Sequence, residues 1–109
     1  MATKEQQIIK YTEQLKKAKV PVNKELLEKV VKMVGPANYQ LDAMFVATSD
    51  KTELQTVLKK FVMKKLDVAD EAKGQKAIDA ATLKLKNAGI RKKYRGVFYY
   101  MLAKKFGIK

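Results

Sequence analysis

The sequence lacks both cysteine and histidine over its 109 residues. The absence of cysteine excludes a disulfide framework, a thiolate zinc site and a thiol nucleophile. The absence of histidine excludes imidazole metal ligands, Ser-His-Asp chemistry and the usual general base at neutral pH. We therefore predict no catalytic residues, no metal site and no cofactor, in a protein that is not an enzyme.

Long apolar runs are missing as well. No segment approaches the roughly 18 apolar residues of a membrane span, and residues 1–7 contain no apolar stretch like that of a signal peptide. These absences predict a cytoplasmic protein without a membrane span. The glycines form neither a phosphate-binding loop nor a dinucleotide-binding fingerprint. Residues 67–78 resemble a calcium-binding loop only superficially, because Ile78 stands where the bidentate glutamate is required.

Positive charge is what the sequence has in excess. Its 24 lysine and arginine residues face 11 acids, which gives a net charge of +13. Such an excess favours polyanionic partners, such as nucleic acid or anionic lipid. However, only Arg91 and Arg95 are arginines. Because arginine is the residue best suited to bidentate recognition of bases, its scarcity argues against sequence-specific reading.

Hydrophobic periodicity predicts an all-α protein: a compact five-helix bundle that forms one domain over residues 1–109. A hydrophobic content of 47% supplies the core of such a domain. Thr3 with Gln6 forms a capping box, and Asn23 and Asp50 are further helix-start signals. The expected helices cover approximately residues 4–19, 24–34, 51–66, 71–88 and 91–106.

Residues 37–49 show no helical period. Their apolar side chains, which include Tyr39, Leu41, Phe45 and Val46, argue against a loose linker. We expect a buried extended connector that contains one short strand.

Most charges have a structural explanation. In the first four predicted helices the acids lie near the start and the lysines near the end, where the helix dipole favours each sign. The last helix reverses this pattern, because residues 90–95 read Ile-Arg-Lys-Lys-Tyr-Arg. Two lysines that end the preceding helix lie just across the turn at Gly89. The candidate anion-binding residues are therefore Lys84, Lys86, Arg91, Lys92, Lys93 and Arg95.

A helix N-terminus offers backbone N–H groups to an anion, and added cations strengthen such a site. Our leading hypothesis is a non-enzymatic basic domain that contacts a polyanion, either a nucleic-acid backbone or a phosphate, through the N-terminus of the last helix. The expected partner is nucleic acid bound without sequence preference. The alternative is that Arg91 and Arg95 form ion pairs within the bundle, with acids such as Asp42, Asp67 or Asp79.

The last predicted helix is apolar all round, which allows two interpretations. Either it is buried centrally, or one face is exposed to a protein partner, a second copy or a stacked base. That candidate interaction face consists of Gly96, Tyr99, Tyr100 and Ala103. A third hypothesis is an enzyme that uses buried carboxylates or Lys105. It requires a concave pocket, and a lysine near a helix end more often extends to water.

Three stretches carry a resemblance. Residues 34–36 read Val-Gly-Pro and precede Tyr39 and Asp42, residues 61–66 read Phe-Val-Met-Lys-Lys-Leu, and residues 93–102 read Lys-Tyr-Arg-Gly-Val-Phe-Tyr-Tyr-Met-Leu. With these stretches, the chain from about residue 34 onward resembles a family of small bacterial proteins known as domain of unknown function 2853. The resemblance implies a compact all-helical fold in a bacterial cytoplasm. It implies no activity and no catalytic residues.

Overall fold

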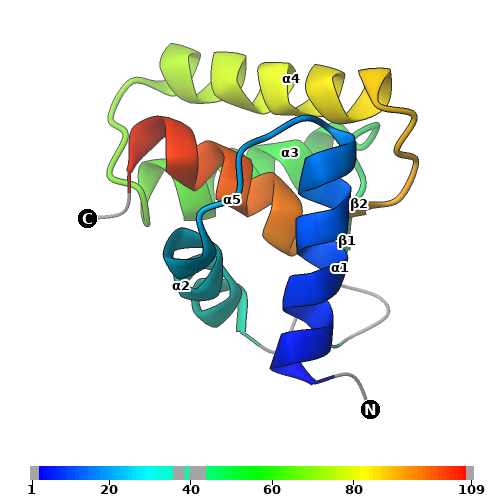
Figure 1. Cartoon of the computed structure of the whole chain (residues 1–109). Coiled ribbons are helices and arrows are strands. Elements are labelled where there is room, and N and C mark those ends of the chain that lie inside the picture. Colours follow the sequence, from blue (N-terminus) through cyan, green and yellow to red (C-terminus); the bar gives the residue numbers. More distant parts are fainter. Residues whose placement is uncertain (1–2, 36–38, 40–43, 108–109) are drawn as a thin grey trace.

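Helices dominate the part of the chain that the computed structural model describes, which is residues 3–35, 39 and 44–107. The helices are α1 (Lys4–Lys17), α2 (Lys24–Val34), α3 (Lys51–Thr56) with its π-helical continuation η2 (Val57–Met63), α4 (Glu71–Asn87) and α5 (Arg95–Phe106) (Figure 1). The strands are β1 (Phe45–Val46) and β2 (Lys93–Tyr94). The predicted all-α class with five helices is confirmed. Within the described residues, no helix is long and apolar enough to cross a membrane.

Local capping signals decide where the first four helices begin. Thr3 and Gln6 exchange hydrogen bonds between side chain and backbone, at 3.2 and 3.1 Å, so the predicted capping box is confirmed. The side chains of Asn23, Asp50 and Asp70 each accept hydrogen bonds from backbone N–H groups in the first turns of α2, α3 and α4. These bonds satisfy donors that the helix itself leaves unpaired.

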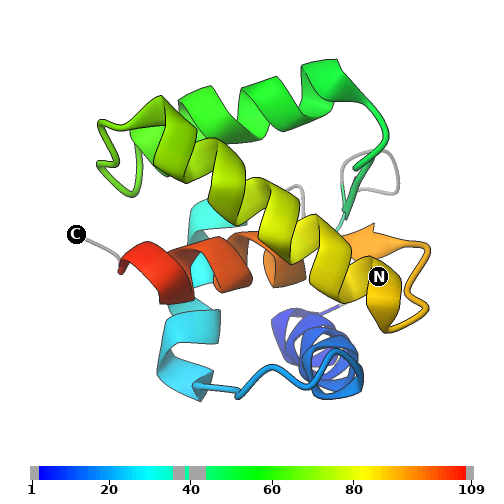
Figure 2. The same cartoon turned by 90° about the horizontal axis from the view of Figure 1, so that it is seen from above.

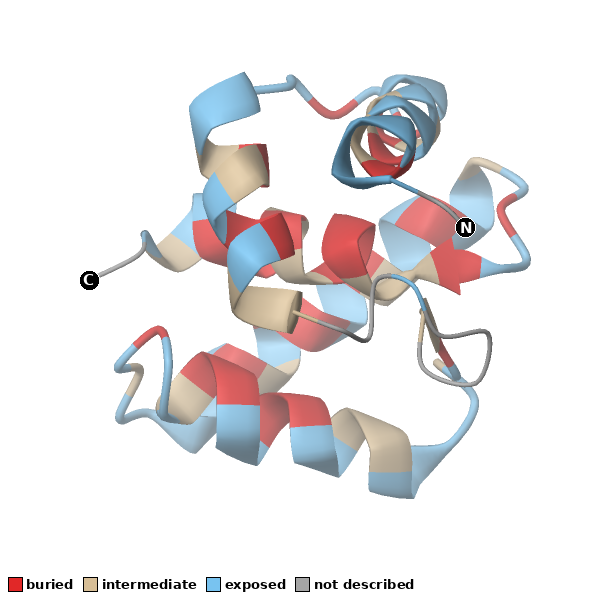
Figure 3. Ribbon diagram, turned by 90° about the horizontal axis from the view of Figure 1, so that it is seen from below, coloured by how far each residue is buried: buried red, intermediate tan, exposed pale blue. Residues whose placement is uncertain are grey.

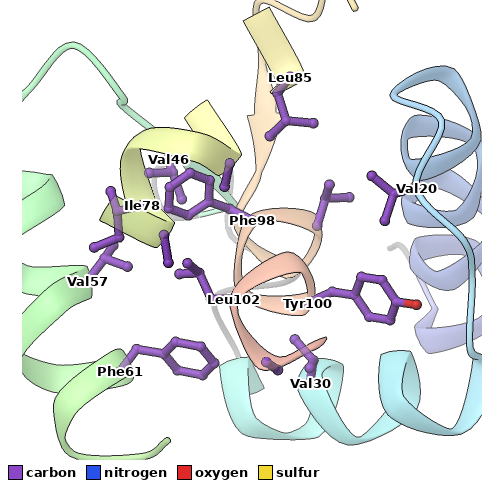
Figure 4. Packing of buried hydrophobic residues seen from close by; sticks show 14 of the residues in the cluster. Val20, Val30, Val46, Val57, Phe61, Ile78, Leu85, Phe98, Tyr100 and Leu102 are labelled. Atoms are coloured by element: carbon purple, nitrogen blue, oxygen red, sulfur yellow. The ribbon is translucent and has the colours of Figure 1, made fainter. Parts of the chain in front are cut away.

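Helix α5 forms the centre of the bundle. It contacts α1, α2, η2 and α4, and Figure 2 shows it running between them. Phe98 and Leu102 point toward the side chains of α4 and η2, whereas Tyr100 points the opposite way, toward the segment that joins α1 to α2 (Figure 4). All three side chains are buried. The prediction that a helix apolar all round lies in the core is therefore confirmed, and Figure 3 shows the exposed faces on the outer helices instead.

The candidate interaction face on α5 is not an exposed patch. Gly96, Tyr100 and Ala103 are buried, so the alternative of a free Tyr/Gly/Ala surface is wrong for these three residues. The hydroxyl of Tyr100 accepts a hydrogen bond from the Asn23 N–H at 2.8 Å and donates one to the Pro21 carbonyl at 2.7 Å. It thereby ties α5 to the segment that joins α1 to α2.

Tyr99 is half-buried on the other side of the same helix. Its ring stacks on Phe61 of η2, with ring centres 4.0 Å apart and planes inclined by 20°. This stacking occupies one face of the Tyr99 ring, so no base can stack on that face.

The strands correct the predicted start of the last helix. β1 and β2 pair antiparallel, with Phe45 opposite Tyr94 and Val46 opposite Lys93. The N–H of Arg95 then donates to the Met44 carbonyl at 2.6 Å. Residues 93–94 are therefore extended, and the expected helix over 91–106 begins only at residue 95. The predicted short strand in the connector is confirmed at residues 45–46. Residues 36–38 and 40–43, and with them Leu41 and Asp42, lie outside the described residues.

Candidate anion-binding site

The turn between α4 and β2 contains the cationic residues Arg91 and Lys92. Gly89 takes the left-handed conformation (φ 76°), which favours glycine, and its N–H donates to the Lys86 carbonyl at 3.0 Å. Ile90 follows with its side chain buried and its N–H bonded to the Leu85 carbonyl at 3.1 Å. The chain is thus anchored immediately before its cationic residues. We call residues 89–93 the basic turn.

Helix α1 fixes the other edge of this segment. The side-chain amide of Gln14 donates to the Lys92 carbonyl at 3.0 Å and accepts from the Tyr94 N–H at 3.1 Å. β2 is therefore held by β1 on one side and by Gln14 on the other. Figures 1 and 2 show the end of α4, β2 and α1 on the same side of the molecule. Because α4, β1 and α1 hold the basic turn in place, the protein loses less conformational entropy when a ligand binds there.

Two clefts flank the basic turn, and Arg91 lines both. The first, which we call the Lys93 cleft, has a volume of about 660 Å³. The second, which we call the α1 cleft, has a volume of about 480 Å³. The cationic residues of the Lys93 cleft are Lys86, Arg91 and Lys93, and no carboxylate is among its lining residues. The cationic residues of the α1 cleft are Lys10, Lys17, Arg91 and Lys92, and Glu13 is its one acid.

Lys93 is unusual among these cations because only 7% of its surface is exposed. Its side chain forms no ion pair or hydrogen bond with any residue the structure describes. Lys93 is nevertheless one of the residues that line the Lys93 cleft. Burying an unpaired charge is costly. Lys93 therefore combines a mostly buried side chain with a charge that no described residue neutralises.

Arg95, in contrast, does not belong to the site. Its Nη2 donates to Glu53 Oε1 at 2.6 Å and its Nη1 donates to the Tyr99 hydroxyl at 3.1 Å. Burial lowers the pKa of Arg95, but the interactions with Tyr99 and Glu53 outweigh it and raise that pKa above its ordinary value. The expectation that Arg95 is neutralised inside the bundle is thus correct, with Glu53 as the acid in place of Asp67 or Asp79.

The other predicted cations separate into two groups. Arg91, Lys92 and Lys93 belong to the basic turn, and Lys86 lines the Lys93 cleft beside it. Lys84, in contrast, is exposed on α4 and lines neither cleft. Arg91 forms no ion pair with the described acids. Its proposed pairing with Asp42 lies outside the described residues.

Sequence reasoning missed the contribution of α1. Lys10 and Lys17 line the α1 cleft although more than 70 residues separate them from the basic turn. The helix dipole alone explains a lysine at the end of α1, and no local signal in the sequence marks either residue as part of a site. Only the packing of α1 beside β2 brings them there. Lys105, by comparison, is exposed, as expected for a lysine near a helix end.

The chain belongs to a protein family described as protein of unknown function (DUF2853), whose model matches residues 10–109. The match confirms the resemblance and extends it from α2 back into α1. No curated protein matches the sequence.

Proposed function

We propose that this member of a family without an assigned activity is a non-enzymatic domain that binds nucleic acid through the basic turn and its two clefts. Binding is electrostatic and independent of base sequence. The observation that carries the proposal is the lining of the two clefts that meet at Arg91: six cationic side chains and a single carboxylate, Glu13. A bacterial cytoplasm is the compartment that we propose for it.

The type of cation supports a backbone contact over base reading. Five of the six side chains are lysines, which act as point charges on flexible stems. Phosphate contacts position a protein on nucleic acid but carry no sequence information. We therefore expect similar affinities for unrelated sequences. The alternative of a protein partner or a second copy on the Tyr99/Tyr100 face has less support, because Tyr100 is buried and Tyr99 is stacked on Phe61.

Fluorescence anisotropy with two labelled duplexes of unrelated sequence tests the proposal at about 50 and 200 mM salt. Both duplexes are expected to bind equally, with an affinity that falls steeply as salt increases. The double variant Arg91→Ala/Lys92→Ala should lower the magnitude of the salt slope by about 1 for each phosphate that the protein no longer neutralises. It should also weaken both duplexes to the same extent.

The matched control is Lys64→Ala/Lys65→Ala. These exposed lysines follow η2 and line neither cleft, and their removal takes away the same charge. The control should bind nearly as well as the wild type. If both double variants bind the duplexes equally weakly, affinity depends on the net charge of the protein alone, and the proposed site is refuted.

A further inference from the structure

The Lys93 cleft differs chemically from the rest of the basic surface. Besides its three cations it is lined by Thr48 and Ser49, two hydroxyl residues in the turn that precedes α3. That turn is closed by a hydrogen bond from the Asp50 N–H to the Ala47 carbonyl at 3.0 Å. The Asp50 carboxylate caps α3 and does not line the cleft. Thr82 also lines it, but its hydroxyl already donates to the Ile78 carbonyl at 2.9 Å. The lining of the cleft thus includes three cationic residues and two further residues with hydroxyl side chains, Thr48 and Ser49.

A second feature that points to a ligand is the state of Lys93. The register of β2 against β1 places Lys93 opposite Val46, which precedes Ala47 and the Thr48–Ser49 turn. Its stem is buried, its ammonium group has no partner among the described residues, and the backbone that carries it is held by Val46 and Gln14. An anion bound in the cleft would supply the negative charge for Lys93 that no described residue provides.

The positive charge of the Lys93 cleft and its number of hydrogen-bond donors determine which type of anion it binds best. A phosphate monoester carries a charge of about −1.5 to −2 at pH 7 and three strong acceptor oxygens. An internal phosphodiester carries one negative charge, and so does a carboxylate. Three cations converging on one cleft without any carboxylate are better matched by the monoester, through charge-assisted hydrogen bonds.

We infer that the Lys93 cleft binds a phosphate monoester group, which under the proposed function is the terminal phosphate of a nucleic-acid strand. The inference rests on that function for its source of ligand. The cleft volume of about 660 Å³ lies within the range of small-molecule sites, so it accommodates the terminal nucleotide together with its phosphate. The strand then continues past Arg91, which lines both clefts, toward Lys92, Lys10 and Lys17.

The test compares labelled single strands of one sequence that end in a 5′-phosphate, a 3′-phosphate or hydroxyl groups only, with a nucleoside monophosphate and its unphosphorylated nucleoside as competitors. The wild type should prefer one of the phosphorylated strands by about tenfold or more, as expected for added hydrogen bonds to a charged group. The monophosphate should compete, and the nucleoside should not.

Two neighbouring variants separate the terminal phosphate from general attraction. Lys93→Met keeps a buried unbranched stem and removes the charge, so it should abolish the preference. The unphosphorylated strand should still bind, weakened only as far as the loss of one charge requires. Lys92→Met removes the same charge from an exposed residue of the α1 cleft. It should weaken all strands equally and leave the preference intact. Circular dichroism confirms that each variant is folded.

The outcomes distinguish the two proposals. Equal affinity for all strands without competition by the monophosphate overturns this inference and leaves the proposed function standing. Lys93-dependent binding of the monophosphate without binding of any strand overturns the proposed function and assigns the cleft to a free phosphorylated small molecule. A preference that persists in Lys93→Met overturns the placement of the phosphate in this cleft.

Discussion

Replacing Gly96 by alanine tests whether this residue serves packing inside the bundle. A Cβ at residue 96 would lie 2.8 Å from both Cδ2 and Cζ of the Tyr11 ring, and closer still to its Cε2. Carbon atoms in contact prefer separations of about 3.5–4.0 Å. The ring of Tyr11 is fully buried and packs against the ring of Tyr94, with centres 5.1 Å apart, so it has little room to move.

Two effects of opposite sign decide the magnitude. Alanine is favoured over glycine inside a helix by about 1 kcal/mol. Overpacking a rigid core costs about 1–3 kcal/mol, and the close approach to an immobile ring places this site at the upper end. We expect Gly96→Ala to lower the free energy of unfolding by about 2 kcal/mol, which corresponds to a decrease in Tm of roughly 10 °C.

Urea denaturation followed by circular dichroism measures this destabilisation. Ala80→Gly, on the exposed side of α4, measures the helix-propensity contribution alone. A double-mutant cycle with Tyr11→Leu then isolates the contact, because a smaller side chain opposite residue 96 should relieve most of the penalty. If Gly96→Ala is as stable as the wild type or more stable, the close packing of α5 on α1 is incorrect.

Two further predictions concern stability. Tyr100→Phe removes a buried hydroxyl that bonds both Asn23 and Pro21, so the free energy of unfolding should fall by about 1–3 kcal/mol in urea denaturation; an unchanged midpoint would contradict this role. Burial, followed by the charges of Tyr39 and Tyr94, raises the pKa of Tyr11 above its ordinary value of 10.0. Above pH 10 the unfolded chain loses this proton while the folded chain keeps it, so stability should decline by up to about 1.4 kcal/mol per pH unit. Urea midpoints between pH 9 and 11 should fall less steeply in Tyr11→Phe, since the lysines contribute equally to both proteins; identical slopes would exclude this cause.

Most helix boundaries could be predicted because their causes are local. Thr3, Asn23 and Asp50 cap backbone N–H groups within three residues of themselves. A pattern of this range is legible in the sequence whatever the rest of the chain does. The start of α5 could not be predicted in the same way, because residues 93–94 are extended through pairing with β1, almost 50 residues earlier.

The arrangement of the charged residues likewise depends partly on local sequence and partly on tertiary packing. The amino-acid sequence alone establishes the net charge, the cluster of cations over residues 84–95 and the apolar character of the last helix. Which of those cations face solvent together depends on the packing of distant segments. The packing places Glu53 beside Arg95, so Arg95 forms an ion pair and is not part of the site. The pairing of β2 with β1 places Lys93 where most of its side chain is buried. The packing also adds Lys10 and Lys17 from α1. Capping and periodicity act over a few residues, whereas the field around a charge depends on every group that the fold brings near it, however distant along the chain.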